Sequence, residues 1–393
     1  MKNNLSIRIL GAIIFIALLF FGFRTASQKP LWNDEIYSQI ASVETLSYSE
    51  ILLGRVNEGN ACPLFYLTQK AVGDIMGYKT PLEWRVKAKV WDFDRYEDRI
   101  VLRIVPVLFT ALTIWLIFSY FANFYSLATA FFSLLLSLST AMFLQYGVEA
   151  RPYALWIFLT TVQVFIFLRL IESSHNRNNL LRWLSVIHIL LSFTVILSLA
   201  QVALICSLLW VYGERSEREW RRYVFLFIMP ALIAITFWLV SPKYPFGLVF
   251  TVDQYLRANI SRDRFYLFWL FVLALSVYGI QQKAKRFYVI SNEILKGLPA
   301  FAIFCGAVAA ACSLLVIFKI KQGPEVQFPV SEKYFIFLAP VGVITLTSLV
   351  DAMVRAIRPY LLKICVIGFV LGMVVPRAFK VIKSLLKQYP NLF

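Results

Sequence analysis

The feature of this chain that most constrains its fold is a series of apolar runs long enough to cross a lipid bilayer. A helix rises 1.5 Å per residue, so about 20 apolar residues span a hydrocarbon core of ~30 Å. One long run, 182–213, predicts two short helices with a tight turn. The sequence therefore predicts an all-α, polytopic membrane protein with about 11 transmembrane helices in a single domain, 1–393. The predicted spans lie near 7–23, 100–122, 124–146, 153–171, 182–213, 222–241, 265–280, 298–318, 334–352 and 360–376.

Composition excludes a soluble protein and argues against a nucleic-acid partner. Hydrophobic residues make up 60% of the chain and charged residues only 16%, which leaves more apolar surface than a soluble domain can bury. The net charge is +17, but the basic residues are scattered through short loops between apolar runs. This is the pattern of cytoplasmic loops in membrane proteins. The five cysteines are unequally spaced and predict neither a disulfide framework nor a zinc site.

The distribution of basic loops predicts which loops face outward. The run from Ile7 to Phe23 is expected to be a retained first helix with its amino end in the cytoplasm. If Pro63 to Gly77 lies in the membrane interface, the later basic loops fall in the cytoplasm; if it crosses, they do not. We therefore predict interfacial helices in a first outer loop, 24–99, with an insertion at 80–98. A basic amphipathic tail is predicted at 377–393.

Two charged pairs are predicted to meet on this outer face. Asp34 and Glu35 follow the first span, and Glu149 and Arg151 lie between two later spans. Lipid tails cannot solvate such charges, so they must face water, a cavity or one another. Two structural alternatives stand beside a functional role. Asp34 could cap the helix that follows it, and Glu149 and Arg151 could pair with each other at a helix start.

Basic residues at the outer ends of the spans suggest an anionic ligand. The positive-inside rule makes such residues scarce in short external loops, so Arg103, Arg151 and Lys333 need another explanation. A phosphate or diphosphate headgroup would supply it, because guanidinium and ammonium groups bind phosphate oxygens. The alternative is a set of solvated ion pairs, which we expect in the run 86–98.

Four short motifs occur in order along the chain: Trp32–Ser38, Asn60–Tyr66, Leu102–Pro106 and Glu149–Leu155. Together they resemble motifs of the GT-C superfamily of membrane glycosyltransferases. The resemblance is to the bacterial branch near the protein O-mannosyltransferases and the lipid A aminoarabinose transferase, and it covers roughly the first 170 residues. Glu332-Lys333-Tyr334 is similar to a late Arg-Tyr motif of that family. The chain departs from the family at Ala61-Cys62, where His-Pro is frequent, and at Lys333, where Arg is usual.

The resemblance implies an enzyme of the bacterial cytoplasmic (inner) membrane with its active site on the periplasmic or extracellular face. Such an enzyme moves a sugar from a polyprenyl-phosphate carrier to a lipid, glycan or protein acceptor. The family's acidic residue in the first outer loop maps onto Asp34, its neighbour onto Glu35 and the second-loop position onto Glu149. Tyr153 and Tyr334 join the substrate-binding set, with an interfacial aromatic belt as the alternative for Tyr153.

The chemistry of sugar transfer gives these residues roles. A carboxylate takes the acceptor's proton, and Asp34 is our choice for this base, with Glu35 or Glu149 orienting the acceptor or shifting its pKa. Cations at Arg103, Arg151 and Lys333 would stabilise the departing phosphate. One base and one leaving phosphate predict inversion at the sugar carbon. A divalent metal is conceivable, but two carboxylates are too few ligands to argue for one.

Three other functions compete with this hypothesis. A polymerase or ligase of lipid-linked oligosaccharides would carry the same outer arginines. A lipid or solute transporter would also have many spans, but it usually shows internal repeats and broken helices at the midplane. A scaffold of an envelope complex would keep the fold without catalysis. Asp34-Glu35 directly after the first span favours the glycosyltransferase.

Overall fold

The protein is a helical bundle closed at one end by a set of short helices. The computed structural model describes most of the chain, and every regular element in the described residues is helical. The described residues are 5–80, 95–172, 176–212, 220–241, 303, 336–356, 364, 367–368, 371–372, 374–381 and 383. The predicted spans near 265–280 and 298–318 therefore lie outside the described residues, apart from position 303, as does the insertion at 80–98 for most of its length.

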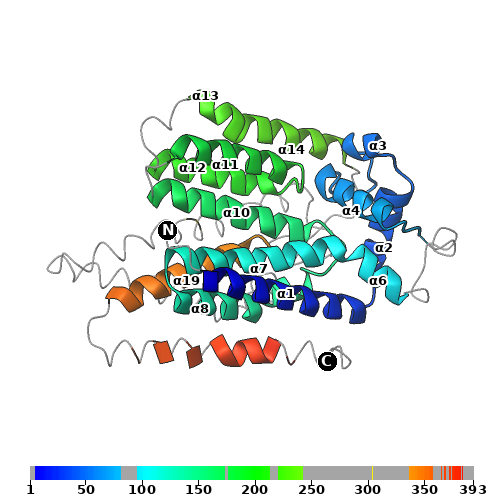
Figure 1. The fold of residues 1–393 in the computed structure, drawn as a ribbon. Helices are drawn as coiled ribbons and strands as arrows, with labels where there is room; N and C mark the ends of the chain where they lie inside the picture. The colour runs from blue at the N-terminus through cyan, green and yellow to red at the C-terminus, as the bar shows by residue number, and fades with distance from the viewer. Residues whose placement is uncertain are drawn as a thin grey trace, which may run out of the picture.

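Among the described residues, three helices are long and apolar enough to cross a membrane: α1 (Leu5–Gln28), α7 (Ile104–Phe124) and α10 (Tyr153–Glu172). Shorter helices run beside them (Figure 1). Helices α11 and α12 divide the run 182–213 as the sequence predicted, and their connection covers 193–197. The shorter helices of the bundle are α8 (Leu127–Ser139), α11 (Arg177–Ser192), α12 (Ser198–Tyr212), α14 (Met229–Val240) and α19 (Leu338–Ala356).

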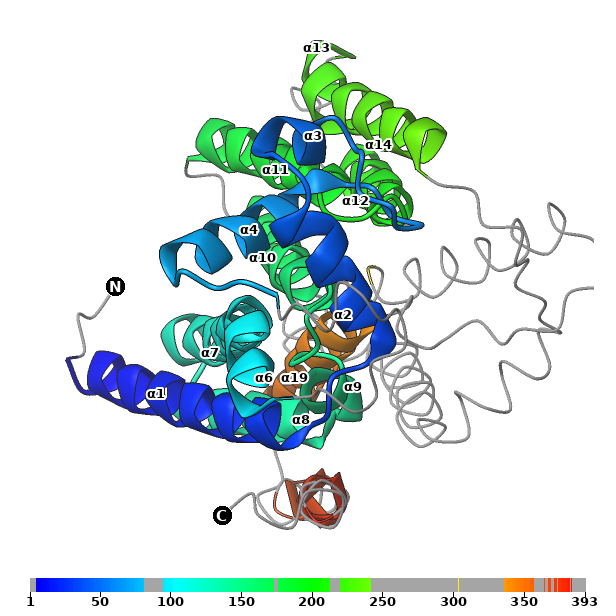
Figure 2. The same ribbon diagram turned by 90° about the vertical axis from the view of Figure 1, so that its right-hand side faces the viewer.

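Short helices gather at one end of this bundle, which we call the capped end (Figures 1 and 2). Here α1 ends, α7 and α10 begin, and the chain between α1 and α7 covers the bundle. The turn between α8 and α10, with α9 (Ala141–Gln145), lies at the same end. The covering elements are α2 (Asn33–Gln39), the π-helical turn η1 (Ile40–Glu44), α3 (Tyr48–Leu52), α4 (Pro63–Ile75) and α6 (Tyr96–Leu102).

The segment Pro63 to Gly77 does not cross the bundle. Its helix α4 has 13 residues, which at 1.5 Å per residue is about 20 Å, too short for a hydrocarbon core of ~30 Å. The chain before α4 and the chain after it also meet at one place. Arg103, which precedes α7, donates a hydrogen bond of 2.8 Å to the carbonyl of Ala26 in α1. Both ends of this loop therefore lie at the capped end, as the interfacial prediction requires.

The motif at Asn60–Tyr66 docks this loop onto the bundle. Pro63 is at the start of α4, where a missing N–H costs nothing. The side chain of Asn60 holds the turn between α11 and α12 from both sides: it donates to the carbonyl of Thr194 at 3.0 Å and accepts from the amide of Ile196 at 3.2 Å. Cys62 is fully buried beside the same turn. The motif residues thus have a structural role, including those that depart from the family pattern.

A proline interrupts the helix that leads to α14. The chain runs from α13 (Trp220–Tyr223) through the π-helical turn η3 (Val224–Ile228) into α14, and Pro230 cannot donate to the carbonyl of Leu226 one turn before it. His188 of α11 donates to that carbonyl instead, through Nδ1 at 2.7 Å, and Cys206 of α12 lies 3.5 Å from it. The freed carbonyl thereby joins three helices.

We expect His188→Phe to lower the thermal stability of the detergent-solubilised protein, because it leaves the buried Leu226 carbonyl with the weaker thiol donor alone. An unpaired buried polar group costs about 1–3 kcal/mol. Adding Pro230→Ala should recover part of the loss, since an alanine at 230 supplies an N–H to that turn. Melting curves of the single and double variants measure both effects, and Ser185→Ala in α11 is the control. An unchanged melting temperature in His188→Phe would contradict the role of this bond.

Candidate functional site

The two charged segments singled out in the sequence meet at the capped end. The amide of Ala150 donates to Glu35 Oε1 at 2.7 Å, which joins the turn before α10 to the first turn of α2. Arg151 reaches the same helix, because its Nη1 donates to Ser38 Oγ at 2.6 Å. The expectation that both charged pairs share one face is therefore confirmed by direct contact.

The Glu35–Arg103 ion pair forms the buried centre of this region. The Glu35 side chain is 1% exposed and that of Arg103 is fully buried. Arg103 Nε donates to Glu35 Oε1 at 2.9 Å and Nη2 to Oε2 at 2.7 Å, a bidentate pairing. The other N–H groups donate to the carbonyls of Ala26, Lys29 and Pro30 where α1 ends. All five donors of the guanidinium group are thus in use.

Both carboxylate oxygens of Glu35 also accept hydrogen bonds. Its Oε1 also accepts from the Ala150 amide, and its Oε2 accepts from the Trp32 amide at 3.0 Å, which closes the first turn of α2. Burial alone would raise the pKa of Glu35, but Arg103 and the Ala150 amide outweigh burial and hold the pKa below its ordinary value. The carboxylate is therefore held ionised. This geometry favours an anchoring role for Glu35 and Arg103 over the catalytic and phosphate-binding roles that the sequence suggested.

A second buried ion pair lies beside the first. Lys29 Nζ donates to Glu149 Oε1 at 2.7 Å and to the carbonyl of Gln145 at 2.8 Å. Their side chains are 7% and 10% exposed. The structure thus pairs Glu149 with Lys29, whereas the sequence alternative paired it with Arg151. The sequence analysis did not predict a role for Lys29. Its position directly after an apolar run and before Pro30 could have indicated one.

Asp34 is the exposed carboxylate of the cluster. It lies in the first turn of α2, where the partial positive charge of the helix end favours an anion. The helix begins at Asn33 with Trp32 as its N-cap, so the capping role considered for Asp34 falls to Trp32 and Glu35 instead. Asp34 and Glu35 are neighbours in sequence, yet one faces outward and the other is buried against Arg103.

Arg151 lies next to Asp34 in a third ion pair that the sequence did not predict. Its Nη1 donates to Glu58 Oε1 at 2.7 Å, and the Asp34 carbonyl is 3.4 Å away. Burial would lower the pKa of Arg151, but Tyr153, Glu58, Tyr66 and Asp34 together raise it well above its ordinary value. Arg151 is thus a fixed cation beside the exposed carboxylate. Glu58 lies two residues before the Asn60–Tyr66 motif, which was the available signal for it.

The remaining predicted residues fall into two groups. Tyr153 begins α10, is 4% exposed, and packs its ring at 6.4 Å from that of Tyr146. It contributes to the wall behind Arg151 and not to the surface, so the aromatic-belt alternative does not apply to it. Lys333 and Tyr334 lie outside the described residues. Among the described residues, no group of three or more His, Cys, Asp or Glu side chains is placed to hold a metal ion.

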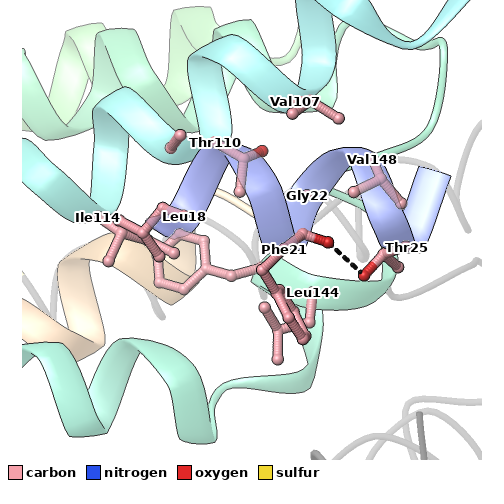
Figure 3. A pocket seen from close by; sticks show the side chains of 11 residues that line it. Leu18, Phe21, Gly22, Thr25, Val107, Thr110, Ile114, Leu144 and Val148 are labelled. Carbon is pink, nitrogen blue, oxygen red and sulfur yellow. Dashed lines mark hydrogen bonds between the residues drawn. The ribbon is translucent and has the colours of Figure 1, made fainter. Parts of the chain in front are cut away.

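A small apolar pocket lies beside α1 (Figure 3). Its cavity volume is about 20 Å³, and it lies between α1, α7 and the segment around α9. The hydroxyl groups of Thr25 and Thr110 on its wall are bonded to the carbonyls of Phe21 and Gly147. A Cβ at Gly22 would lie 2.7 Å from Val107 Cγ1, so a glycine lets α1 approach α7 here. The pocket offers packing space and no polar group for a sugar or phosphate.

We expect Arg103→Gln to prevent stable folding, because it leaves the buried Glu35 carboxylate without its ion-pair partner. Breaking a buried ion pair by removing one partner costs about 3–5 kcal/mol. The matched control is Arg99→Gln, whose guanidinium is half-buried and donates at 3.0 Å to the carbonyl of Ser27. Size-exclusion profiles and melting curves in detergent are the measurements. Equal stability of the two variants would contradict the anchoring role.

The lowered pKa of Glu35 predicts a loss of stability in acid. A carboxylate whose folded pKa lies below its unfolded value of 4.5 stabilises the fold above that pH and loses this contribution as pH falls through the folded pKa. The melting temperature of the wild type should therefore fall more steeply below pH 4.5 than that of Glu35→Gln. Parallel pH profiles for the two proteins would contradict the assignment.

Comparisons with known proteins leave the family open. No protein-family model matches this chain, and no curated protein matches it in sequence. The resemblance to the GT-C superfamily therefore rests on the four short motifs. Of these, Trp32–Ser38, Leu102–Pro106 and Glu149–Leu155 contribute side chains or amides to the ion-pair cluster, and Asn60–Tyr66 attaches the loop that carries Glu58.

Proposed function

We propose that this protein is an inverting glycosyltransferase. It moves a sugar from a polyprenyl-phosphate carrier to a lipid, glycan or protein acceptor at the membrane surface. The observation that carries the proposal is the juxtaposition of the exposed Asp34 with the fixed cation Arg151, at one end of a bundle that contains three candidate membrane-spanning helices. A base and a cation at a membrane surface are what transfer from a lipid-linked phosphate requires.

In the proposed reaction the acceptor hydroxyl attacks the sugar carbon that bears the phosphate. Asp34 takes the hydroxyl proton, the bond from the sugar carbon to the phosphate oxygen breaks, and its electron pair leaves with the carrier phosphate. Arg151 stabilises the charge that grows on that phosphate. Lys333 and Tyr334 remain expected phosphate and substrate ligands. A single displacement inverts the configuration of the sugar carbon.

The proposal includes an eleven-span, GT-C-like fold in a bacterial cytoplasmic membrane, with the capped end on the outer face. The distribution of charge supports this orientation. The far end of the described bundle carries arginines with few acids, as cytoplasmic ends do, whereas the capped end carries both signs. The far-end arginines are Arg8, Arg169, Arg177, Arg182, Arg222 and Arg355.

The main rivals differ in substrate and in where polar groups are needed. A polymerase or ligase of lipid-linked oligosaccharides would use the same cation with a diphosphate-linked donor, so donor identity separates it from the proposal. A transporter needs a polar site near the membrane midplane. The polar groups there, among the described residues, include Gln163 and Gln201, which are neutral and hydrogen-bonded to each other at 2.9 Å. The ion pairs lie at the ends of the helices.

We expect Asp34→Asn to reduce sugar transfer at least about 10²-fold, because a positioned base contributes 10²- to 10⁴-fold. The carboxylate is exposed, so the variant should fold like the wild type. The assay uses purified protein, a polyprenyl-phosphate sugar that the wild type accepts, and release of the carrier phosphate as the readout. Asp74→Asn, an exposed carboxylate at the end of α4, is the control. Full activity of Asp34→Asn would remove Asp34 from the reaction.

A further inference from the structure

Glu58 is a buried carboxylate with one oxygen tied to the protein and the other left over. Its Oε1 accepts from Arg151 Nη1 at 2.7 Å and from the hydroxyl of Ser38. No hydrogen bond to its Oε2 occurs in the described part of the chain, and the side chain is 10% exposed. The Oε2 atom is not among the fully buried polar atoms, so it reaches solvent, where a ligand's donor group can replace water.

The other acidic residues of the cluster differ from Glu58. Both oxygens of Glu35 are occupied, by Arg103 and by the amides of Trp32 and Ala150. Glu149 is fixed by Lys29. Glu58 is therefore the carboxylate of the cluster that keeps one oxygen without a donor among the described residues. The sequence had given Glu35 and Glu149 the role of orienting the acceptor.

The position of Glu58 is well fixed by its surroundings. Ser38 holds it from α2 and Arg151 from the turn before α10, while its own loop is attached two residues later by the Asn60 side chain. The hydroxyl of Tyr66 donates to the Asn60 carbonyl at 3.2 Å from within α4. A carboxylate held from three elements keeps its orientation without a substrate, which is the condition for efficient positioning.

Arg151 is arranged in the same way. Its Nη1 is bonded to Glu58 and Ser38, whereas its buried Nε has no partner and no bond from Nη2 occurs among the described residues. The Nη1–Oε1 bond thus joins two groups that each keep unused capacity. One can donate to an anion, and the other can accept from a hydroxyl or amine.

We infer that Glu58 is the second carboxylate of the active site, and that its Oε2 accepts a hydrogen bond from a second hydroxyl or amine group of the acceptor, next to the attacking hydroxyl, while Arg151 binds the departing phosphate. The inference rests on the proposed function and names the residue that positions its acceptor. Asp34 still takes the proton of the attacking hydroxyl, and Glu58 holds the acceptor by its other donor group, which aligns the attacking oxygen with the sugar carbon. An acceptor with such a second donor group is favoured over one with a single hydroxyl, because Oε2 would otherwise lose its water in the complex without gaining a donor.

The test is Glu58→Gln, which keeps an oxygen for Arg151 and Ser38 but places an NH₂ group, a donor, at the Oε2 position. We expect the kcat/KM for the acceptor to fall by about 10²-fold. The KM for the polyprenyl-phosphate sugar should stay within about twofold of the wild-type value. Glu97→Gln, an exposed carboxylate in α6, should change neither constant.

The outcomes separate the inference from the proposed function. If the wild type releases carrier phosphate but Glu58→Gln raises the donor KM and spares the acceptor constants, Glu58 acts only by holding Arg151 and the inference fails. Unchanged constants would refute it as well. Should Glu58→Gln not fold, the same split between acceptor and donor must appear in Glu58→Asp, which keeps the charge and withdraws the oxygen. If the wild type transfers no sugar from any donor, the proposed function itself fails.

Discussion

The buried pairing of Arg103 with Glu35 is the interaction on which the capped end depends. Two charges withdrawn from water are tolerated only when every lone pair and N–H group is satisfied. Here the five guanidinium donors and both carboxylate oxygens are all engaged. Their partners come from the end of α1, the start of α2, the start of α7 and the turn before α10. Residues distant in sequence are thereby fixed relative to one another at one end of the bundle.

This anchor also explains how the outward-facing groups are positioned. Asp34 precedes Glu35, and Arg151 follows Ala150, so each candidate functional residue is adjacent to a residue that the anchor holds. Immobilising Glu35 and the Ala150 amide fixes the backbone on which Asp34 and Arg151 stand. Catalytic groups need such support, because a displacement of about 1 Å can cost 10²-fold in rate. The buried ion pairs thus hold the backbone in place, and the exposed groups next to them are available to a substrate.

Much of this could be predicted from the sequence, because the strongest constraint is local. Length and apolarity identified α1, α7 and α10, and the loop charges implied that Pro63 to Gly77 does not cross. The meeting of Asp34-Glu35 with Glu149-Arg151 followed from counting crossings. The partner of each charged side chain could not be predicted in the same way. Whether Glu149 pairs with Arg151 or with Lys29, and whether Arg103 faces a ligand or Glu35, depends on sub-ångström placement of side chains far apart in sequence.

Glu58 also could not be predicted from the sequence. One glutamate in a loop carries no signal by itself, and only its contact with Arg151 and Ser38 shows that one of its oxygens remains unfilled.

The most direct test of the central claim is a reaction with purified wild-type protein. It is incubated with a panel of polyprenyl-phosphate sugars and hydroxyl-bearing acceptors, and carrier release and product configuration are followed. The account predicts release of the carrier phosphate with at least one donor and an inverted sugar linkage in the product. Folded protein that leaves every donor intact, or a product with retained configuration, would contradict it.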